Sequence, residues 1–280
     1  MGESKKKKGG GITTVLLILV LIIGLSLLLY PTVSDYINSL NQSNVISHYT
    51  EIVADMDDEE CQRLIEAARK YNESIHDRDN VLVLSYEEEQ LYKSLLNVSP
   101  DGAMGYIEIP SIKCTLPIHH GTSNIVLQTA IGHLEWTSLP VGGEGTHSVV
   151  SGHRGLPSAK LFTNLDKLEK GDIFIIRVLN EVMTYEVDQI TIIRPDEVDV
   201  LKIEEGEDYC TLFTCTPYAI NTHRLCVRGR RIDNIEESKK IHVTSEAMQI
   251  EPLLVAPIVA MPILLLLFVI ASIANRRARR

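Results

Sequence analysis

Two long apolar runs lie near the two ends of the chain. The first, Ile12 to Leu29, has 18 residues and no charge, and the second, Pro252 to Ala274, has 23 uncharged residues. A helix that crosses a bilayer needs about 20 apolar residues, within a range of about 17–25. Both runs therefore predict transmembrane helices, at residues 12–29 and 252–274.

Basic residues flank the two runs on the sides that face the chain ends. Lys5 to Lys8 precede the first run, and four of the last five residues are arginine. Because basic flanks stay in the cytoplasm, we expect a two-pass protein with residues 1–11 and 275–280 inside and residues 31–251 outside. A cleaved signal peptide is the alternative for the first run, but no small-residue cleavage site follows it. A buried core helix is the alternative for the second run.

Residues 31–103 begin with a helical pattern and continue as a polar stretch. Val33, Tyr36, Ile37 and Leu40 have helical spacing, and the pattern predicts a helix over residues 33–72. The acidic run at residues 55–60 suits the N-terminus of a helix, and it suits a solvated face equally well. A short helix is expected at residues 87–96.

From residue 105 onward the pattern changes to short alternating strands. The expected strands are residues 105–110, 173–178, 183–187, 190–193, 209–215 and 223–231. Turn residues separate them at intervals typical of a closed or sandwiched β domain. We therefore predict a mainly β fold, with a β-barrel at residues 104–233 and short helices near residues 124–129 and 159–165. Residues 234–251 are expected to form a polar tether to the second span.

The charge is divided unevenly between these segments. The chain has 27 Lys and Arg against 37 Asp and Glu, a formal net charge of -10, with a mean hydropathy of +0.05. Eight of the basic residues and one acidic residue lie in the two end segments, so the part between them has a net charge of -17. This acidic outer part excludes a nucleic-acid-binding protein, which should be basic.

The cysteines all lie outside the predicted spans, at Cys61, Cys114, Cys210, Cys215 and Cys226. An extracellular location permits disulfides, but the odd number leaves at least one thiol free. The last three cysteines and His223 do not have the spacing of a usual structural zinc site. No dense acidic loop suggests calcium either. We therefore expect no metal and no cofactor.

Cys215 has the setting of a nucleophile. It lies at the end of the apolar strand 209–215, at a rim that solvent and substrate can reach. Arg224 follows nine residues later, at the start of the strand 223–231, so a hairpin would place the two side chains face to face. A nearby guanidinium favours the thiolate and donates hydrogen bonds to an oxyanion.

Such a site needs a proton donor, and the chain has nine histidines. His153 follows an apolar strand at a rim flanked by Gly152 and Gly155, the same context as that of Cys215. Spacing alone therefore favours His153 without excluding the other eight. His223 competes as the base, but adjacent strand residues face opposite ways, so only one of His223 and its neighbour Arg224 can meet the thiol.

Three segments of the chain resemble motifs of the sortase family. Residues 211–218 (TLFTCTPY) together with residues 221–225 (NTHRL) closely resemble the sortase active-site signature TLxTC…R. Residues 138–157 resemble the histidine region of the family, and residues 105–110 resemble its first barrel strand. The second predicted span and the residues around Cys215 and Arg224 are similar to those of class C, the pilin-polymerising sortases. The resemblance is tight over about residues 104–232.

This resemblance implies a sortase-type closed β-barrel with His153, Cys215 and Arg224 as catalytic residues. Family members cut an LPXTG-like sorting signal between Thr and Gly through a cysteine thioester. His153 would protonate the leaving amine and deprotonate the incoming one, and Arg224 would hold the substrate and the oxyanion. In class C the acceptor is a pilin lysine, so the product is a pilus polymer. Through the thioester, one difficult acyl transfer becomes two easier steps.

Two alternatives concern what the outer domain acts on. A housekeeping-type sortase would attach surface proteins to a cell-wall precursor amine. A non-enzymatic membrane protein would use its acidic domain in assembly or adhesion. The expected partners are a sorting signal, an acceptor amine and the membrane, with no nucleic acid.

A lid before the barrel is usual in class C, where an Asp-Pro-aromatic tripeptide anchors it in the active site. This chain has no such tripeptide between residues 73 and 103, and residues 77–81 occupy its expected place. The departure leaves lid gating in doubt.

Overall fold

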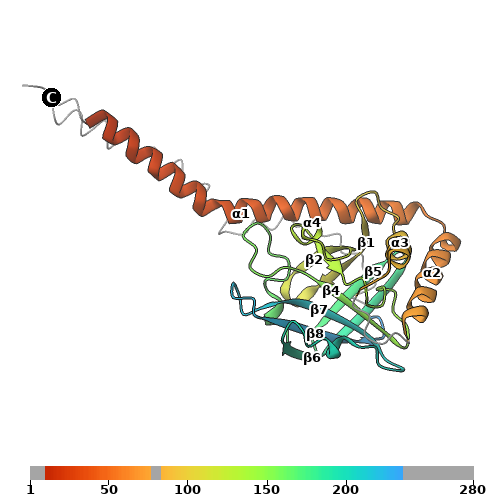
Figure 1. The fold of residues 1–280 in the computed structure, drawn as a ribbon. Coiled ribbons are helices and arrows are strands. Elements are labelled where there is room, and N and C mark those ends of the chain that lie inside the picture. Colours follow the sequence, from red (N-terminus) through yellow and green to blue (C-terminus); the bar gives the residue numbers. More distant parts are fainter. Residues whose placement is uncertain (1–9, 77–82, 236–280) are drawn as a thin grey trace, which may run out of the picture.

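The computed structural model describes residues 10–76 and 83–235. Its first helix, α1 (Gly10–Asp55), contains the first apolar run and continues without a break through Pro31. A proline inside a helix removes one backbone hydrogen bond and kinks the helix. Figure 1 shows such a change of direction between the part of α1 that projects from the domain and the part that lies along it. The prediction of separate helices before and after this proline was therefore wrong.

Two shorter helices follow α1 before the barrel begins. The acidic run ends α1 and starts α2 (Asp58–His76), whose first turn carries Asp58, Glu59 and Glu60 at the positive end of the helix dipole. The expected helix at residues 33–72 is thus two helices. The next helix, α3 (Tyr86–Ser94), starts with a capping box between Ser85 and Glu88 and confirms the predicted short helix.

Eight strands close into the predicted barrel, in the order β1-β2-β3-β4-β7-β8-β6-β5. Short helices interrupt them: η1 (Pro110–Ile112), α4 (Asn124–Leu127), η2 (Leu165–Lys167) and η3 (Asp199–Leu201). The strands are β1 (Ala103–Ile109), β2 (Cys114–His120), β3 (Ile131–His133), β4 (Thr146–Ser151), β5 (Ile173–Val178), β6 (Glu181–Ile193), β7 (Asp208–Thr216) and β8 (His223–Ile232). Two pairs are parallel, β2 with β3 and β4 with β7, and the others are antiparallel.

Two local predictions differ from this barrel. The expected strands at residues 183–187 and 190–193 form one strand, β6, which keeps pairing with β8 across an irregularity between Val187 and Gln189. A bulge of this kind adds a residue without ending a strand. The expected helix at residues 159–165 is a series of turns followed by the short helix η2.

Alternation along the strands separates two apolar clusters. Leu212 of β7 and Val227 of β8 point into the barrel, where they join its main core. Their neighbours Phe213 and Cys226 point outward and join a second cluster with Val149, Ile193, Leu201 and Trp136. This outer cluster lies under the connection from β6 to β7, which contains η3.

The second half of α1 is fixed to the barrel by buried polar contacts. The hydroxyl of the buried Tyr49 donates a hydrogen bond to the Met104 carbonyl (3.0 Å) and accepts one from the Leu179 amide (2.7 Å). Further along the same two strands, Glu108 of β1 and Arg177 of β5 form a buried ion pair at 2.6 Å. The predicted tether at residues 234–251 and second span at residues 252–274 lie beyond the described residues, apart from the first two tether positions.

Candidate active site

Strands β4 and β7 bring the predicted histidine and cysteine to the same end of the barrel. Their parallel register ends with Ser151 opposite Phe213, and two hydrogen bonds continue it. The Gly152 amide donates to the Phe213 carbonyl (3.1 Å), and the Thr214 hydroxyl donates to the Gly152 carbonyl (2.7 Å). His153 and Cys215 each follow two residues after the last paired position, so they extend the two strands in step.

The antiparallel pair β7 and β8 places the predicted arginine beside the cysteine. Cys215 and Arg224 are direct register partners, which confirms the predicted hairpin. Because strand side chains alternate between faces, Cys215 shares the outer face of the barrel with Phe213, and Arg224 shares it with Cys226. The Arg224 guanidinium donates to the carbonyls of Asn221 (3.2 Å) and His223 (3.1 Å), which holds it at the turn. His223 pairs with Thr216 on the opposite face and is exposed.

Three of the other four cysteines are poorly suited to attack a substrate. Cys61, Cys210 and Cys226 are buried, and burial raises the pKa of each thiol, to about 12 for Cys226. A protonated, enclosed thiol is a poor nucleophile. All five cysteines are free thiols in the structure. Cys114, on β2, and Cys215, at the barrel rim, are both half-buried.

Two histidines are held inside the fold by hydrogen bonds. His133 contacts the Ser138 carbonyl through Nε2 (2.8 Å) and the Tyr92 hydroxyl through Nδ1 (3.0 Å), and burial lowers its pKa to about 3. His147 contacts the Lys202 carbonyl through Nδ1 (2.8 Å) and the Thr211 hydroxyl through Nε2 (2.7 Å), and burial lowers its pKa to about 4. A base with both ring nitrogens occupied cannot serve a substrate, so these two have structural roles.

The remaining histidines of the described residues lie on other elements than the rim of β4 and β7. His48 is on α1, His76 is on α2, and His119 and His120 are on β2, while His242 lies outside the described part. Of the described histidines, His153 is therefore the one that the strand register brings level with Cys215.

Comparison with known proteins identifies the family. A profile described as the Sortase domain matches residues 107–232. The crystal structure of sortase C1 from Streptococcus agalactiae is 48% identical, with a TM-score of 0.67, over 69% of this chain and 100% of that chain. The chain belongs to the sortase family. The recognition made from the three motifs, and with it the prediction of a cysteine transpeptidase, is thereby confirmed.

Two further relatives show how far the similarity extends. A Clostridium perfringens sortase C, whose structure is described as containing the C-terminal cell wall sorting motif, is 47% identical over 68% of this chain and 99% of that chain, with a TM-score of 0.60. Sortase D of Bacillus subtilis is 29% identical over 133 residues, which are 46% of this chain and 64% of that protein. The matched part thus spans less than two thirds of this curated relative.

Two side chains support the sortase site through contacts that were not predicted from the sequence. Arg154 has a buried side chain that donates to the Thr216 hydroxyl (3.2 Å) and pairs with Asp166 (2.5 Å). It therefore ties the segment after His153 to the residue after Cys215. Tyr218 packs its ring over Gly155, which has a left-handed φ of +75°. The sequence did not indicate Asp166 as the partner of Arg154, or Tyr218 as the neighbour of Gly155.

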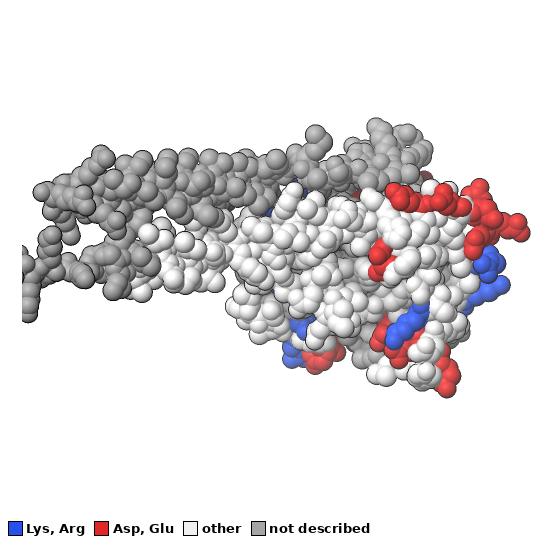
Figure 2. Space-filling view, turned by 90° about the horizontal axis from the view of Figure 1, so that it is seen from above, with Lys and Arg blue, Asp and Glu red and all other residues white. Residues whose placement is uncertain are grey.

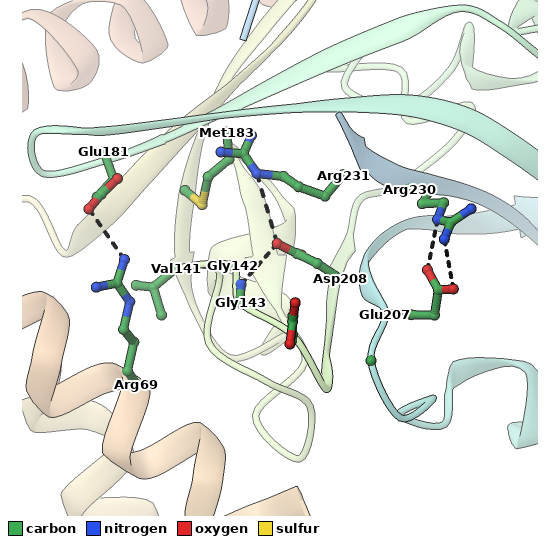
Figure 3. Close-up of a pocket in the computed structure, with 12 residues that line it drawn as sticks. Arg69, Val141, Gly142, Gly143, Glu181, Met183, Glu207, Asp208, Arg230 and Arg231 are labelled. Carbon is green, nitrogen blue, oxygen red and sulfur yellow. Dashed lines mark hydrogen bonds and ion pairs between the residues drawn. The ribbon is translucent and has the colours of Figure 1, made fainter. Parts of the chain in front are cut away.

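A polar cavity of about 420 Å³ lies at the opposite end of the sortase barrel (Figure 3). It surrounds Asp208, the first residue of β7, which is about 23 Å from Cys215 at the usual rise of a strand. Its arginines face carboxylates, in the pairs Arg69–Glu181, Arg230–Glu207 and Arg231–Asp208. Burial raises the pKa of Asp208, whose carboxylate also accepts a hydrogen bond from the Gly143 amide. This cavity is separate from the thiol.

Metal and lid predictions have different outcomes. In the part of the chain that the structure describes, no group of three or more His, Cys, Asp or Glu is placed to hold a metal ion. The absence of metals and cofactors stays a prediction. The expected place of the lid anchor, residues 77–81, lies outside the described residues.

Proposed function

We propose that His153, Cys215 and Arg224 form the catalytic site of a membrane-anchored transpeptidase that joins pilins. The observation that supports this most strongly is the register of β4, β7 and β8, which brings three residues from separate segments to one rim. Family membership speaks against the alternative of a non-enzymatic assembly or adhesion protein.

The proposed reaction begins at the carbonyl of Thr in an LPXTG-like sorting signal. The Cys215 thiolate attacks this carbonyl, and the Arg224 guanidinium donates hydrogen bonds to the oxyanion that develops. The C–N bond to Gly breaks as His153 gives a proton to the leaving amine, and a thioester remains on Cys215. His153 then takes a proton from the acceptor amine, which attacks the thioester and releases the thiolate.

The acceptor distinguishes the two remaining functions. Similarity to sortase C structures from Streptococcus agalactiae and Clostridium perfringens supports a pilin lysine. A cell-wall precursor amine, the acceptor of a housekeeping sortase, uses the same chemistry at Cys215. The structure of Clostridium perfringens sortase C is described as containing the C-terminal cell wall sorting motif, and this supports an LPXTG-like donor for either acceptor.

The membrane anchor in this proposal is the apolar part of α1. The helix is long and apolar enough to span a bilayer, with a mean hydropathy of 2.6 over its most apolar stretch, where 6% of the residues are buried. Its basic N-terminal flank supports a cytoplasmic N-terminus with the barrel outside the cell. The second span at residues 252–274 would make the protein two-pass.

The test uses the full chain in lipid with an LPXTG peptide and two competing acceptors, a lysine-bearing pilin peptide and a cell-wall precursor amine. We expect a thioester adduct on Cys215 by mass spectrometry and an isopeptide product with the lysine. Cys215→Ala abolishes the adduct, whereas Cys114→Ala, at another half-buried thiol, keeps it. An adduct that survives Cys215→Ala refutes the assignment, and product formed only with the wall amine favours the housekeeping function.

His153 and Arg224 have separate signatures in the same assay. We expect His153→Gln to slow turnover by about 10²–10⁴-fold, the usual contribution of a general acid or base. Arg224→Lys keeps the charge but loses the fork of donors, and we expect a loss of about 10²–10³-fold, as for removal of an oxyanion donor. Turnover within twofold of the parent for either variant contradicts its role.

A further inference from the structure

The outer face of β5 is buried although it points away from the barrel core. Phe174, Ile176 and Val178 belong to the main core inside the barrel, so Ile175 between them points outward. Ile175 is nevertheless only 2% exposed, and it belongs to none of the three apolar clusters that the described residues form. An apolar sheet face needs another segment packed against it.

The neighbours of Ile175 on this outer face are buried as well. Its register partner on β1, Glu108, pairs with Arg177, and these two side chains are 9% and 5% exposed. Its register partner on β6, Thr184, is fully buried. Glu186 follows Thr184 on the same face of β6 and is exposed, so the buried region ends there. We refer to Ile175, Glu108, Arg177 and Thr184 as the β5 face.

Helix α1 covers the strand next to the β5 face. Ile46 and Tyr49 of α1 form a cluster with Ala103 and Tyr106 of β1, and the helix packs along β1 and β2. The barrel order β2-β1-β5-β6-β8 therefore places the β5 face between the strands under α1 and β8, the last described strand.

The last described residues bring the chain to the edge of the β5 face. Strand β8 ends at Ile232, which is the register partner of Thr184. Two residues later, the side-chain amide of Asn234 donates to the Val182 carbonyl (2.8 Å), and its oxygen accepts from the Thr184 hydroxyl (3.0 Å). The chain that continues after Ile235 therefore starts beside β6, one strand away from Ile175.

This starting point is remote from the membrane end of α1. Val182 follows closely after Leu179, whose amide donates to the Tyr49 hydroxyl of α1. Tyr49 is 20 residues beyond Leu29, the end of the first apolar run, which is about 30 Å along a helix. In the two-pass topology of the proposed function, the second run starts at the same membrane surface, so residues 236–251 have to return over a similar distance.

The length of this segment allows the return only if much of it is extended. Ile235 and Pro252, the start of the second run, are 17 residues apart. That length spans about 26 Å as a helix and about 56 Å as a strand. Ile241 and Val243 alternate with polar neighbours, a pattern that favours a strand with one apolar face.

The surface beside α1 suits such a segment. In the view of Figure 2, Asp and Glu gather mainly at the end remote from the apolar part of α1, and most of the described surface nearer to that part is uncharged. A chain that returns along this side meets few solvated charges, whereas the outer face of β6 and β8 carries the exposed Glu186 and Arg230.

We propose that residues 236–251 dock on the β5 face, with Ile241 and Val243 toward Ile175, and so return to the membrane beside α1. The inference rests on the two-pass topology of the proposed function and adds to it the path between the barrel and the second span. Two segments on one side of the barrel, α1 and the tether, then hold the domain to the membrane.

Hydrogen–deuterium exchange of the full chain in lipid vesicles tests the docking. In one variant, a Gly/Ser sequence of equal length replaces residues 236–251, so that both predicted spans keep their place. We expect the amides of β5 to exchange about tenfold faster or more in this variant, because the β5 face loses its cover, while those of β7 exchange as in the parent. Unchanged exchange in β5, or an equal increase in β5 and β7, overturns the proposal.

Single substitutions test the contact itself with the tether length unchanged. Val243→Asp puts a carboxylate against the β5 face and should speed exchange in β5 about threefold or more. Thr244→Asp, whose side chain alternates to the other side of an extended segment, is the matched control and should leave exchange unchanged. Equal exchange in the two variants contradicts the inference.

Two further readings separate the docking from its alternatives. Protection of β5 that follows protein density in the membrane, and not residues 236–251, identifies a second copy of the chain as the cover and overturns the proposal. The thioester assay at Cys215 is read independently. A parent that forms no adduct contradicts the proposed function, while the exchange of β5 still decides the docking.

Discussion

The contact between Gly155 and Tyr218 is expected to position the turn that joins Cys215 to Arg224. Gly155 has a φ of +75°, a conformation that side chains with a Cβ adopt at a cost of about 1–3 kcal/mol. An added methyl group would also lie 2.9 and 3.1 Å from two atoms of the Tyr218 ring. Because Tyr218 is half exposed and can move, we assign this contact the low end of the overpacking range, about 1 kcal/mol.

Gly171 provides a matched control for backbone strain. Its φ is +92°, and an added Cβ there would have no neighbour within 4 Å. Gly155→Ala should therefore lower the free energy of unfolding by about 1 kcal/mol more than Gly171→Ala, a difference of about 2–4 °C in Tm for a domain of this size. Only Gly155→Ala should slow peptide turnover, because only it displaces the turn beside the thiol.

A double-mutant cycle assigns the effect to the ring. In a Tyr218→Ala background the added methyl group has space, so Gly155→Ala should cost no more stability than Gly171→Ala. The assay combines thermal unfolding with turnover of an LPXTG peptide. The reasoning is refuted if Gly155→Ala and Gly171→Ala match in both stability and turnover, or if Tyr218→Ala leaves the difference unchanged.

Three other predictions follow from buried polar groups. His133 and His147 are neutral in the fold, with pKa values of about 3 and about 4, whereas in the unfolded chain they take up protons below pH 6.5. The free energy of unfolding should therefore fall as the pH decreases below 6.5, by about 2 kcal/mol per histidine at pH 5. Urea titrations of the parent and of His147→Gln at several pH values check this, and an equal dependence on pH in both contradicts it. Glu108→Gln should cost about 3–5 kcal/mol in thermal unfolding because it removes one charge of a buried ion pair, that of Glu108 with Arg177. Glu197→Gln, in an exposed pair with Arg194, should cost under about 1 kcal/mol. Comparable losses would disprove the distinction. In Arg154→Lys the single ammonium group cannot contact both Thr216 and Asp166. We therefore expect slower peptide turnover and a loss of about 1–3 kcal/mol in the free energy of unfolding. A variant equal to the parent in both measurements rules out the positioning role.

The strands were the part of the fold that the sequence predicted best. The strand at residues 173–178 has the predicted bounds, and β1, β7 and β8 differ from theirs by one or two residues at an end. Short apolar alternation and turn residues are local signals, so these four strands could be recognised alone, whereas β2 and β3 were not among the expected strands. The order of strands in the barrel could not, because the parallel pairing of β4 with β7 joins segments about 60 residues apart.

The candidate site was predicted from motifs and from local context, and the register then supplied its geometry. The hairpin of Cys215 and Arg224 followed from strand alternation and a short turn, which are local. The choice of His153 among nine histidines needed family resemblance, because its approach to Cys215 depends on the parallel pair. Tyr218 and Asp166 gave no local signal, since their roles arise from contacts with Gly155 and Arg154 across the fold.

In the proposed topology, the parallel pairing of β4 and β7 also determines when the candidate active site forms during export. His153 reaches the outside of the cell 62 residues before Cys215, and β5 and β6 must emerge between them. Contacts of such long sequence separation form late in folding because chain closure costs entropy before it is repaid. In the proposed site, a chain that has exported His153 but not yet Cys215 therefore has a base without its thiol. In the proposed function, acyl transfer would begin only when the last strands have closed the barrel, so an incompletely exported chain would leave the sorting signals around it intact.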